Sequence, residues 1–143
     1  MLIGEYNHNL DPKSRLIMPA KFREDMGARF YVTKGLDRCL RAYSYEEWSK
    51  YMEKINVLPD SDKMARLFKR EVLANSSECE TDKQGRILIP SKLKEYAGIE
   101  KEVVIIGQST YIEFWSKDNW DNYQSGEELS LDDLASMMSS YGL

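Results

Sequence analysis

The feature that most constrains the fold of this chain is an internal duplication. Residues 82–98 repeat the pattern of residues 11–27 at a constant offset, including a central triplet of apolar residues. The correspondence continues downstream with one extra residue, so the sequence predicts two copies of one supersecondary unit. The two copies share six identical positions: Asp11/Asp82, Arg15/Arg86, Pro19/Pro90, Lys21/Lys92, Glu24/Glu95 and Gly27/Gly98.

The loop that opens each copy begins with an aspartate. An aspartate side chain in a tight turn can accept hydrogen bonds from backbone N–H groups, and a glycine permits a positive φ. We therefore expect Asp11, Asp82 and Gly85 to shape the two loops. In the first copy, Ser14 replaces the loop glycine and Pro12 restricts φ, so that loop is expected to be the stiffer one.

After the loop and a brief apolar strand, each copy predicts a short helix. Pro19 and Pro90 stand where the helix would begin, because proline suits the first helical position, and Gly27 and Gly98 stand where it would end. Two strand-forming runs follow. Each repeat is therefore predicted as strand, loop, strand, short helix and two further strands.

The chain has 143 residues, which is enough for one ordinary domain or two very small ones. A repeat of roughly 45 residues would bury too little surface to be stable alone. We therefore expect the two copies to fold against each other. No apolar run approaches the ~20 residues of a membrane span, and residues 1–8 lack the apolar core of a signal peptide, which predicts a cytoplasmic protein. Cys39 and Cys79 are predicted to be reduced structural cysteines.

The formal net charge of −4 by itself disfavours a polyanionic partner. However, residues 1–74 carry 14 Lys and Arg against 11 Asp and Glu, whereas residues 75–143 carry 6 against 13. From Ser116 onward one lysine stands against six acids, so the acidic balance belongs largely to the tail. A basic surface elsewhere on the chain is compatible with this distribution.

Two further segments are predicted to be helical. The connector helix over residues 63–74 carries basic residues that form either a solvated face or a supplementary phosphate-binding surface. Residues 130–133 resemble a helix cap, and the short amphipathic helix after them is expected to dock on the domain or on a neighbouring subunit. The predicted organisation is a first repeat at 5–47, a helical connector at 48–75, a second repeat at 76–119 and an acidic helical tail at 120–143.

With two copies of Asp-x-x-x-Arg, three apolar residues and Pro-x-Lys in place, the chain closely resembles the MraZ family of bacterial transcriptional regulators. The resemblance covers nearly the whole chain and includes Trp48 and Trp120 after the two motifs. Each copy also resembles the DNA-binding domain of AbrB transition-state regulators, whose pattern is Asp-x-x-Gly-Arg, an apolar strand, Ile-Pro and a short helix ending in Gly. The chain departs from that pattern at Ser14 and on the short helix, where Arg23-Glu24 and Lys94-Glu95 replace paired arginines.

The resemblance implies an α+β, β-rich fold, namely a pseudo-twofold swapped-hairpin AbrB-like barrel built from two ββαβ repeats in one chain, with added helices. It also implies a sequence-specific DNA-binding regulator, a repressor of the division and cell-wall gene cluster that acts as a homo-oligomeric ring on repeated promoter boxes. Double-stranded DNA and further copies of the chain would be its partners, in the cytoplasm and at the nucleoid.

Arg15 and Arg86 are the candidate DNA-reading residues. An arginine at the end of a rigid hairpin can contact phosphates or bind a guanine edge with two hydrogen bonds, whereas a structural role would pair it with Asp11 or Asp82 inside the turn. Neighbouring cations would add sequence-independent attraction to phosphates. These supporting candidates are Lys13, Lys83, Lys21, Lys92, Arg23 and Lys94.

Other functional classes find less support in the residues. His8 is the only histidine, and no catalytic or metal-ligand constellation can be assembled around it, so we expect no enzyme activity, catalytic residue, metal, cofactor or small-molecule substrate. The alternative function is a protein-interaction module, such as an antitoxin-like or scaffolding ring, without specific DNA recognition. The repeated aromatic residues are predicted core or subunit contacts, with base stacking as the alternative: Tyr43, Trp48, Tyr51, Trp115, Trp120 and Tyr123.

Overall fold

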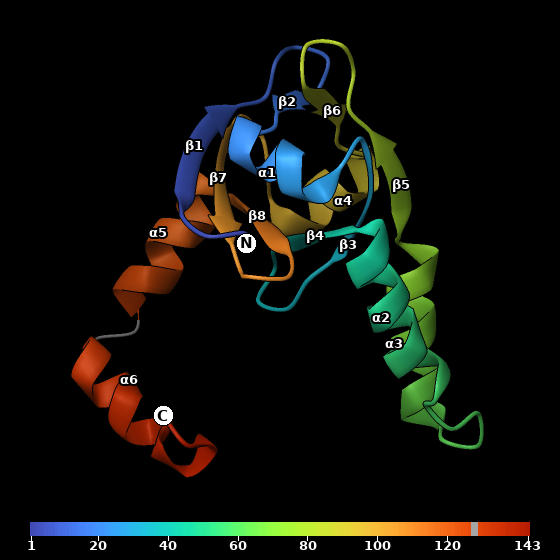
Figure 1. Cartoon of the computed structure of the whole chain (residues 1–143), viewed down its shortest axis with the longest axis vertical. Helices are drawn as coiled ribbons and strands as arrows, with labels where there is room; N and C mark the ends of the chain where they lie inside the picture. Colours follow the sequence, from blue (N-terminus) through green and yellow to red (C-terminus); the bar gives the residue numbers. More distant parts are fainter. Residues whose placement is uncertain (127–128) are drawn as a thin grey trace.

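The computed structural model describes residues 1–126 and 129–143, so Glu127 and Glu128 of the predicted acidic tail lie outside the described residues. Both halves of the chain have the same order of elements: two strands, a helix, two strands and two helices (Figure 1). The first half contains β1 (Glu5–Asn9), β2 (Arg15–Ile17), α1 (Ala20–Met26), β3 (Arg29–Lys34), β4 (Leu40–Ser44), α2 (Tyr45–Asn56) and α3 (Lys63–Ala74). The second contains β5 (Ser77–Glu80), β6 (Arg86–Leu88), α4 (Ser91–Ala97), β7 (Glu102–Gly107), β8 (Ile112–Ser116), α5 (Lys117–Gly126) and α6 (Leu131–Met137), followed by the short 3-10 helix η1 (Ser139–Tyr141).

One antiparallel sheet of six strands joins the repeats in the order β1-β7-β8-β4-β3-β5. Each repeat gives its first strand to the other repeat: β1 pairs with β7, with Tyr6 opposite Ile105, and β5 pairs with β3, with Cys79 opposite Phe30. Strands β4 and β8 join the halves at the centre. If each strand is replaced by its counterpart in the other repeat, the same strand order results, read in the opposite direction, so the sheet is pseudo-symmetric. The prediction that the two copies fold against each other is confirmed.

The mixture of helices and antiparallel strands agrees with the predicted α+β class, but two details differ. The described residues form no closed barrel, because β2 and β6 pair with each other in a separate two-stranded sheet and leave β1 and β5 as the sheet edges. Helices also contain more residues than strands, because α2, α3, α5 and α6 add to the repeat units, so the expected β-rich balance is wrong.

The main hydrophobic core draws on both repeats and holds the small β2–β6 sheet in place. Leu16 of β2 and Ile87 of β6 are almost fully buried in it. Phe22 of α1 joins the same core and meets the ring of Tyr6 edge-on at a centroid distance of 5.1 Å. Since the core would lose about 25 cal/mol for each Å² of apolar surface re-exposed, separating the repeats would be costly.

The repeated aromatic residues pack beside α2 and α5. Trp48 stacks on Tyr31 with ring planes 8° apart, and Trp115 meets Trp120 at a centroid distance of 5.4 Å. Tyr43, Trp48 and Trp115 are buried, whereas Tyr123 is 46% exposed. The predicted core role is therefore confirmed for the three buried side chains.

The helix boundaries follow the local sequence signals closely. The connector helix α3 spans the predicted residues, with the Asp62 side chain accepting a hydrogen bond from the Met64 N–H at its start. Pro19 and Pro90 are the N-caps of α1 and α4, one residue before the predicted first helical position. The helices end at Gly27 and Gly98, where φ is positive, as glycine allows.

Both cysteines are buried and free, as predicted. Burial is the main cause that raises the pKa of the Cys79 thiol to about 11, and burial together with Glu113 raises the pKa of Cys39. Both side chains therefore stay protonated at neutral pH and behave as small core residues.

Candidate nucleic-acid interface

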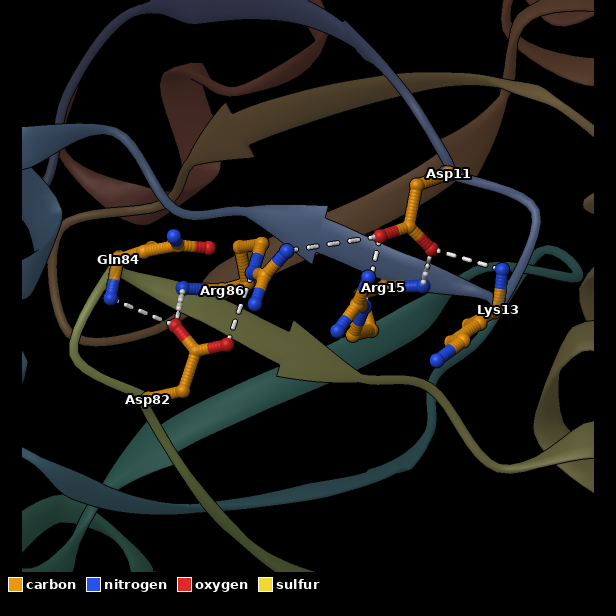
Figure 2. A network of polar contacts seen from close by, with 6 residues as sticks. All are labelled: Asp11, Lys13, Arg15, Asp82, Gln84 and Arg86. Carbon is orange, nitrogen blue, oxygen red and sulfur yellow. Dashed lines mark hydrogen bonds and ion pairs between the residues drawn. The ribbon is translucent and has the colours of Figure 1, made fainter.

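Strands β2 and β6 form a two-stranded antiparallel ribbon in which Leu16 lies opposite Ile87. Because successive strand residues point to opposite faces, these buried residues define the inner face of the ribbon. The structure thus brings the two predicted DNA-reading arginines, which come from different repeats, onto one surface (Figure 2). This outer face carries Arg15, Ile17, Arg86 and Leu88.

The first loop is organised by the carboxylate of Asp11. Its Oδ1 accepts hydrogen bonds from the backbone N–H groups of Lys13 and Arg15, both at 2.9 Å. Its Oδ2 accepts a hydrogen bond from Arg15 Nε at 2.7 Å. The backbone N–H of Ser14 also donates to the Asp11 carbonyl oxygen, which closes the turn.

The second loop repeats this geometry around Asp82. The backbone N–H groups of Gln84 and Arg86 donate to Asp82 Oδ1 at 2.9 Å, and Arg86 Nε donates to Oδ2 at 2.8 Å. The Gly85 N–H donates to the Asp82 carbonyl oxygen. Both aspartates therefore accept hydrogen bonds from backbone N–H groups of their own loops, as expected of loop-shaping residues.

The aspartate pairs orient the two arginines and leave donors for another partner. A guanidinium group has five N–H donors, and each aspartate engages its arginine mainly through Nε. Arg86 Nη1 also lies 4.0 Å from Asp11 Oδ2, which links the two loops. The side chains of Arg15 and Arg86 remain 31% and 25% exposed. Pairing within the turn, the structural alternative, is thus compatible with contact to an external acceptor.

The electrostatics of the loops keep both aspartates charged. Backbone hydrogen bonds from Arg15 are the largest cause that lowers the pKa of Asp11, and those from Arg86 do the same for Asp82. Hydrogen bonds from the arginine side chains lower both values further. At neutral pH, each arginine therefore has an ionised carboxylate beside it that limits its freedom to rotate.

The two loops have a positive φ at equivalent positions, although the first contains Pro12 and the second Gly85. Ser14 has φ 62° and Gly85 has φ 76° at equivalent positions. A residue with a Cβ in this region costs about 1–2 kcal/mol. In the first loop, the Ser14 hydroxyl receives a hydrogen bond from Lys94 Nζ at 2.6 Å, which offsets part of that cost.

Arg23 and Lys94, predicted as phosphate contacts, each brace the loop of the other repeat. Lys94 of α4 binds Ser14 in the first loop, and Arg23 of α1 lies against Gly85 in the second. A Cβ on Gly85 would lie 2.7 Å from the Arg23 Cζ atom, so a larger residue there would require the Arg23 side chain to shift. The repeat pattern alone did not indicate this exchange, because it depends on how the two units interlock.

The remaining predicted cations are exposed but do not form one cluster. Lys13 and Lys83 lie in the loops beside the aspartates. Lys21 and Lys92 lie on α1 and α4, and the charge of Lys92 helps to lower the pKa of Glu71, which places Lys92 near the end of α3. The loop lysines are therefore the better placed of these cations to accompany the arginines.

Ile17 and Leu88 are candidate site residues that sequence reasoning missed. They are 49% and 61% exposed on the outer face of the ribbon, opposite Arg86 and Arg15 respectively. Residues 16–18 and 87–89 are uniformly apolar triplets in the sequence, so the exposed middle residue of each triplet was not recognised. Strand alternation was the available signal, because the middle residue of a three-residue strand segment must face away from its two neighbours.

Other kinds of site find no support in the described parts of the chain. Across residues 1–126 and 129–143, no three His, Cys, Asp or Glu side chains gather in a way that could hold a metal ion. None of the helices in these ranges is both long and apolar enough to cross a membrane.

Comparison with known proteins supports the duplication and the resemblance. The family described as "MraZ protein, putative antitoxin-like" matches twice in tandem, over residues 1–71 and 72–140. The proteins named transcriptional regulator MraZ from Caldicellulosiruptor bescii and Acetivibrio thermocellus are 54% and 51% identical to this chain. A protein of the same name from Caldanaerobacter subterraneus subsp. tengcongensis is 50% identical. Each of these three alignments covers 100% of both chains.

Proposed function

Because this chain belongs to the MraZ family, whose curated relatives are named transcriptional regulators, we propose that it regulates transcription by binding specific DNA through the β2–β6 ribbon. Membership of a family of transcriptional regulators also means that the protein is not an enzyme. Double-stranded DNA is its expected partner.

The observation that carries the proposal is the outer face of the ribbon. The major groove of B-DNA is wide enough for a two-stranded β-ribbon, and an arginine can donate two hydrogen bonds to the O6 and N7 atoms of guanine. Arg15 and Arg86 lie diagonally across the ribbon, each held by an aspartate (Figure 2). Such fixed donors lose less conformational entropy on binding than free side chains do.

The other residues of the surface have distinct proposed tasks. Ile17 and Leu88 would contact the methyl groups of thymine, the apolar feature of the major groove. Lys13 and Lys83 would attract phosphates without reading sequence. Arg23 and Lys94 would act mainly by holding the opposite loop in shape, with their charge adding to the field.

The proposal also covers the regulated genes, the assembly of the chain and the organisation of its repeats. We propose a repressor of the division and cell-wall gene cluster that acts as a homo-oligomeric ring on repeated promoter boxes and associates with the nucleoid. The reciprocal pairings of β1 with β7 and β5 with β3 support a swapped-hairpin relationship between the repeats. The boundaries 5–47, 48–75, 76–119 and 120–143 are kept as the proposed organisation.

The test compares binding to a fragment from upstream of the protein's own gene with binding to an unrelated fragment, in the presence of competitor DNA. We expect preferential binding by the native protein and loss of that preference in Arg15→Ala and Arg86→Ala. Arg29→Ala is a matched control, because Arg29 is an exposed arginine whose ion pair with Glu78 is long, at 3.8 Å. Equal affinity for both fragments, or none, would instead favour the protein-interaction module, which the words antitoxin-like in the family description also suggest.

A further inference from the structure

The C-terminal helix α6 is well formed, yet its apolar side is uncovered. Its first turn is fixed by a capping box in which Ser130 and Asp133 exchange side-chain and backbone hydrogen bonds. Leu131, Leu134 and Met138 recur at the spacing of one helical face, and they are 81%, 43% and 38% exposed. Every residue from 129 to 143 is exposed. A helix this short is not expected to be stable in isolation, so its apolar face needs a partner.

A groove of about 340 Å³ runs along α3, the helix that holds the corresponding place in the first half of the chain. We call it the α3 groove. Its apolar lining comes from α3 and from the loop that precedes it, and Leu73 is 38% exposed there. The apolar lining residues are Leu58, Pro59, Ala65, Leu73 and Ala74.

The charges of the two surfaces are opposite. The charged residues that line the α3 groove are three cations, Arg66, Lys69 and Arg70, and one acid, Asp60, so the groove is net positive. The segment 129–143 contains Asp132 and Asp133 but no lysine or arginine. An acidic amphipathic helix therefore matches a groove whose lining is partly apolar and net positive.

We propose that α6 of one copy docks in the α3 groove of a neighbouring copy. The inference deepens the ring assembly of the proposed function by naming its interface. Figure 1 shows α2 with α3 on one side of the sheet and α5 with α6 on the other side. Because the two complementary surfaces lie on different sides of the molecule, the contact is head-to-tail. Repetition of such a contact closes into a ring when the rotation permits.

The first test uses substitutions in the full-length chain. Leu134→Glu with Met138→Glu places charge on the apolar face of α6, and Leu73→Glu places it in the α3 groove. Each is expected to convert the assembly to a species near the chain mass of 16.7 kDa in light scattering. Leu36→Glu is the control, because Leu36 is 61% exposed in the β3–β4 turn and belongs to neither surface. Thermal melting of each variant checks that the fold is retained.

Mixing the two defective variants distinguishes docking between chains from docking within one chain. The α6 variant keeps an intact groove and the groove variant keeps an intact α6, so one productive contact remains possible. We expect a one-to-one heterodimer that grows no further. If the mixture stays monomeric while both variants are folded, α6 does not dock in the groove of another copy and the proposal is overturned.

Charge reversal provides a second check that does not alter apolar packing. Lys69→Glu with Arg70→Glu should raise the dissociation constant of assembly by at least about tenfold, because like charges then face each other. Adding Asp132→Lys should restore assembly. Unchanged assembly in all of these variants would show that another surface, such as the exposed Met64, Leu67 and Phe68 on α3, joins the copies, and the proposal would fail.

The outcome is separable from that of the proposed function. A monomeric α6 variant keeps both loops and the ribbon, so it should still distinguish the upstream fragment from unrelated DNA, with lower affinity. If the assembly tests succeed and no chain prefers the upstream DNA, the proposed function fails while the interface stands. If the preference is present and the substitutions leave assembly intact, only the interface is wrong.

Discussion

Asp11 and Asp82 each accept two backbone hydrogen bonds and one from an arginine side chain. Replacing Asp82 by Ala should therefore lower the melting temperature and weaken DNA binding together, because the loop and the arginine lose the same anchor. Calorimetry and binding isotherms measure the two effects. If Asp82→Ala weakened DNA binding but left the melting temperature unchanged, Asp82 would contact DNA directly and would not act by shaping the loop.

The same aspartates predict a dependence of stability on pH. The folded pKa of Asp82 lies below its unfolded value, about 3.9, because the Arg86 backbone and then the Arg86 side chain bind its ionised form. Its contribution is complete above the unfolded pKa and is lost as the pH falls through the folded pKa. We expect the melting temperature to decline below about pH 4 and the decline to be shallower in Asp82→Asn. Equal slopes in the two proteins would contradict the assignment.

Substituting the loop arginines and substituting the loop lysines should weaken DNA binding in different ways. Arg15→Ala and Arg86→Ala are each expected to weaken specific binding by roughly 1–3 kcal/mol without unfolding the protein, with Arg15→Ala at least as severe because its half of the chain is net positive. Lys13→Ala or Lys83→Ala should weaken specific and unrelated DNA about equally and flatten the salt dependence. Isotherms at several salt concentrations decide this, and a clearly larger loss for Arg86→Ala would reverse the ranking.

Ile17 and Leu88 predict an effect of thymine methyl groups. An upstream fragment made with deoxyuridine in place of thymidine lacks these methyl groups and should bind the native protein less tightly. The double variant Ile17→Ala with Leu88→Ala should bind both fragments alike, since it lacks the side chains that we propose contact the methyl groups. If deoxyuridine weakens the variant as much as the native protein, the effect comes from DNA shape and not from these residues.

At the scale of elements, the second loop and α1 should be energetically coupled. Gly85→Ala places a Cβ against Arg23 and keeps a positive φ, so it should destabilise the fold by more than Gly98→Ala, whose Cβ would meet Asn119 Nδ2 at an ordinary 3.5 Å. Arg23→Ala should relieve the steric part of the loss. A double-mutant cycle of unfolding free energies measures the coupling, and additive values would show that Arg23 moves aside at no cost.

The sequence predicted elements well where signals are local. The connector helix α3 begins and ends at the predicted residues, and Pro and Gly bracket α1 and α4. It does not predict packing that depends on a partner surface. Met64, Leu67 and Phe68 lie on one helical face with Val72, yet of these four residues only Val72 is buried. Periodicity shows which side of a helix is apolar, but not whether the chain itself covers that side.

At the scale of the whole molecule, the duplication predicted that the repeats associate but not how their strands would be distributed. Strand β1 pairs with β7 and strand β5 with β3, although the paired residues, such as Tyr6 and Ile105, are far apart in the sequence. No local sequence pattern encodes contacts of this kind. For the candidate site, the motif predicted Arg15, Arg86 and their aspartates, which the structure places in the two loops. Strand alternation could have indicated the exposed Ile17 and Leu88, whereas the bracing by Arg23 and Lys94 became visible only in the interlocked repeats.

The ribbon is small, since β2 and β6 each have three residues, so one copy can make few base contacts and should bind a single box weakly. Several ribbons on one assembly would raise the effective concentration at the second box, a gain that commonly reaches about 10²–10⁴. We therefore expect the native protein to bind a fragment with two footprinted boxes at least about tenfold more tightly than a fragment with one.

That gain depends on geometry as well as on assembly. The variant with Leu134→Glu and Met138→Glu should bind one-box and two-box fragments with equal affinity per box. For the native protein, inserting about half a helical turn, roughly 5 base pairs, between the two boxes should reduce the gain in affinity, because it turns one box to the opposite side of the duplex. Gel-shift titrations with the four combinations of protein and DNA separate these effects. If the native protein gains nothing from the second box, each copy acts alone on DNA, and assembly through α6 serves a purpose other than avidity.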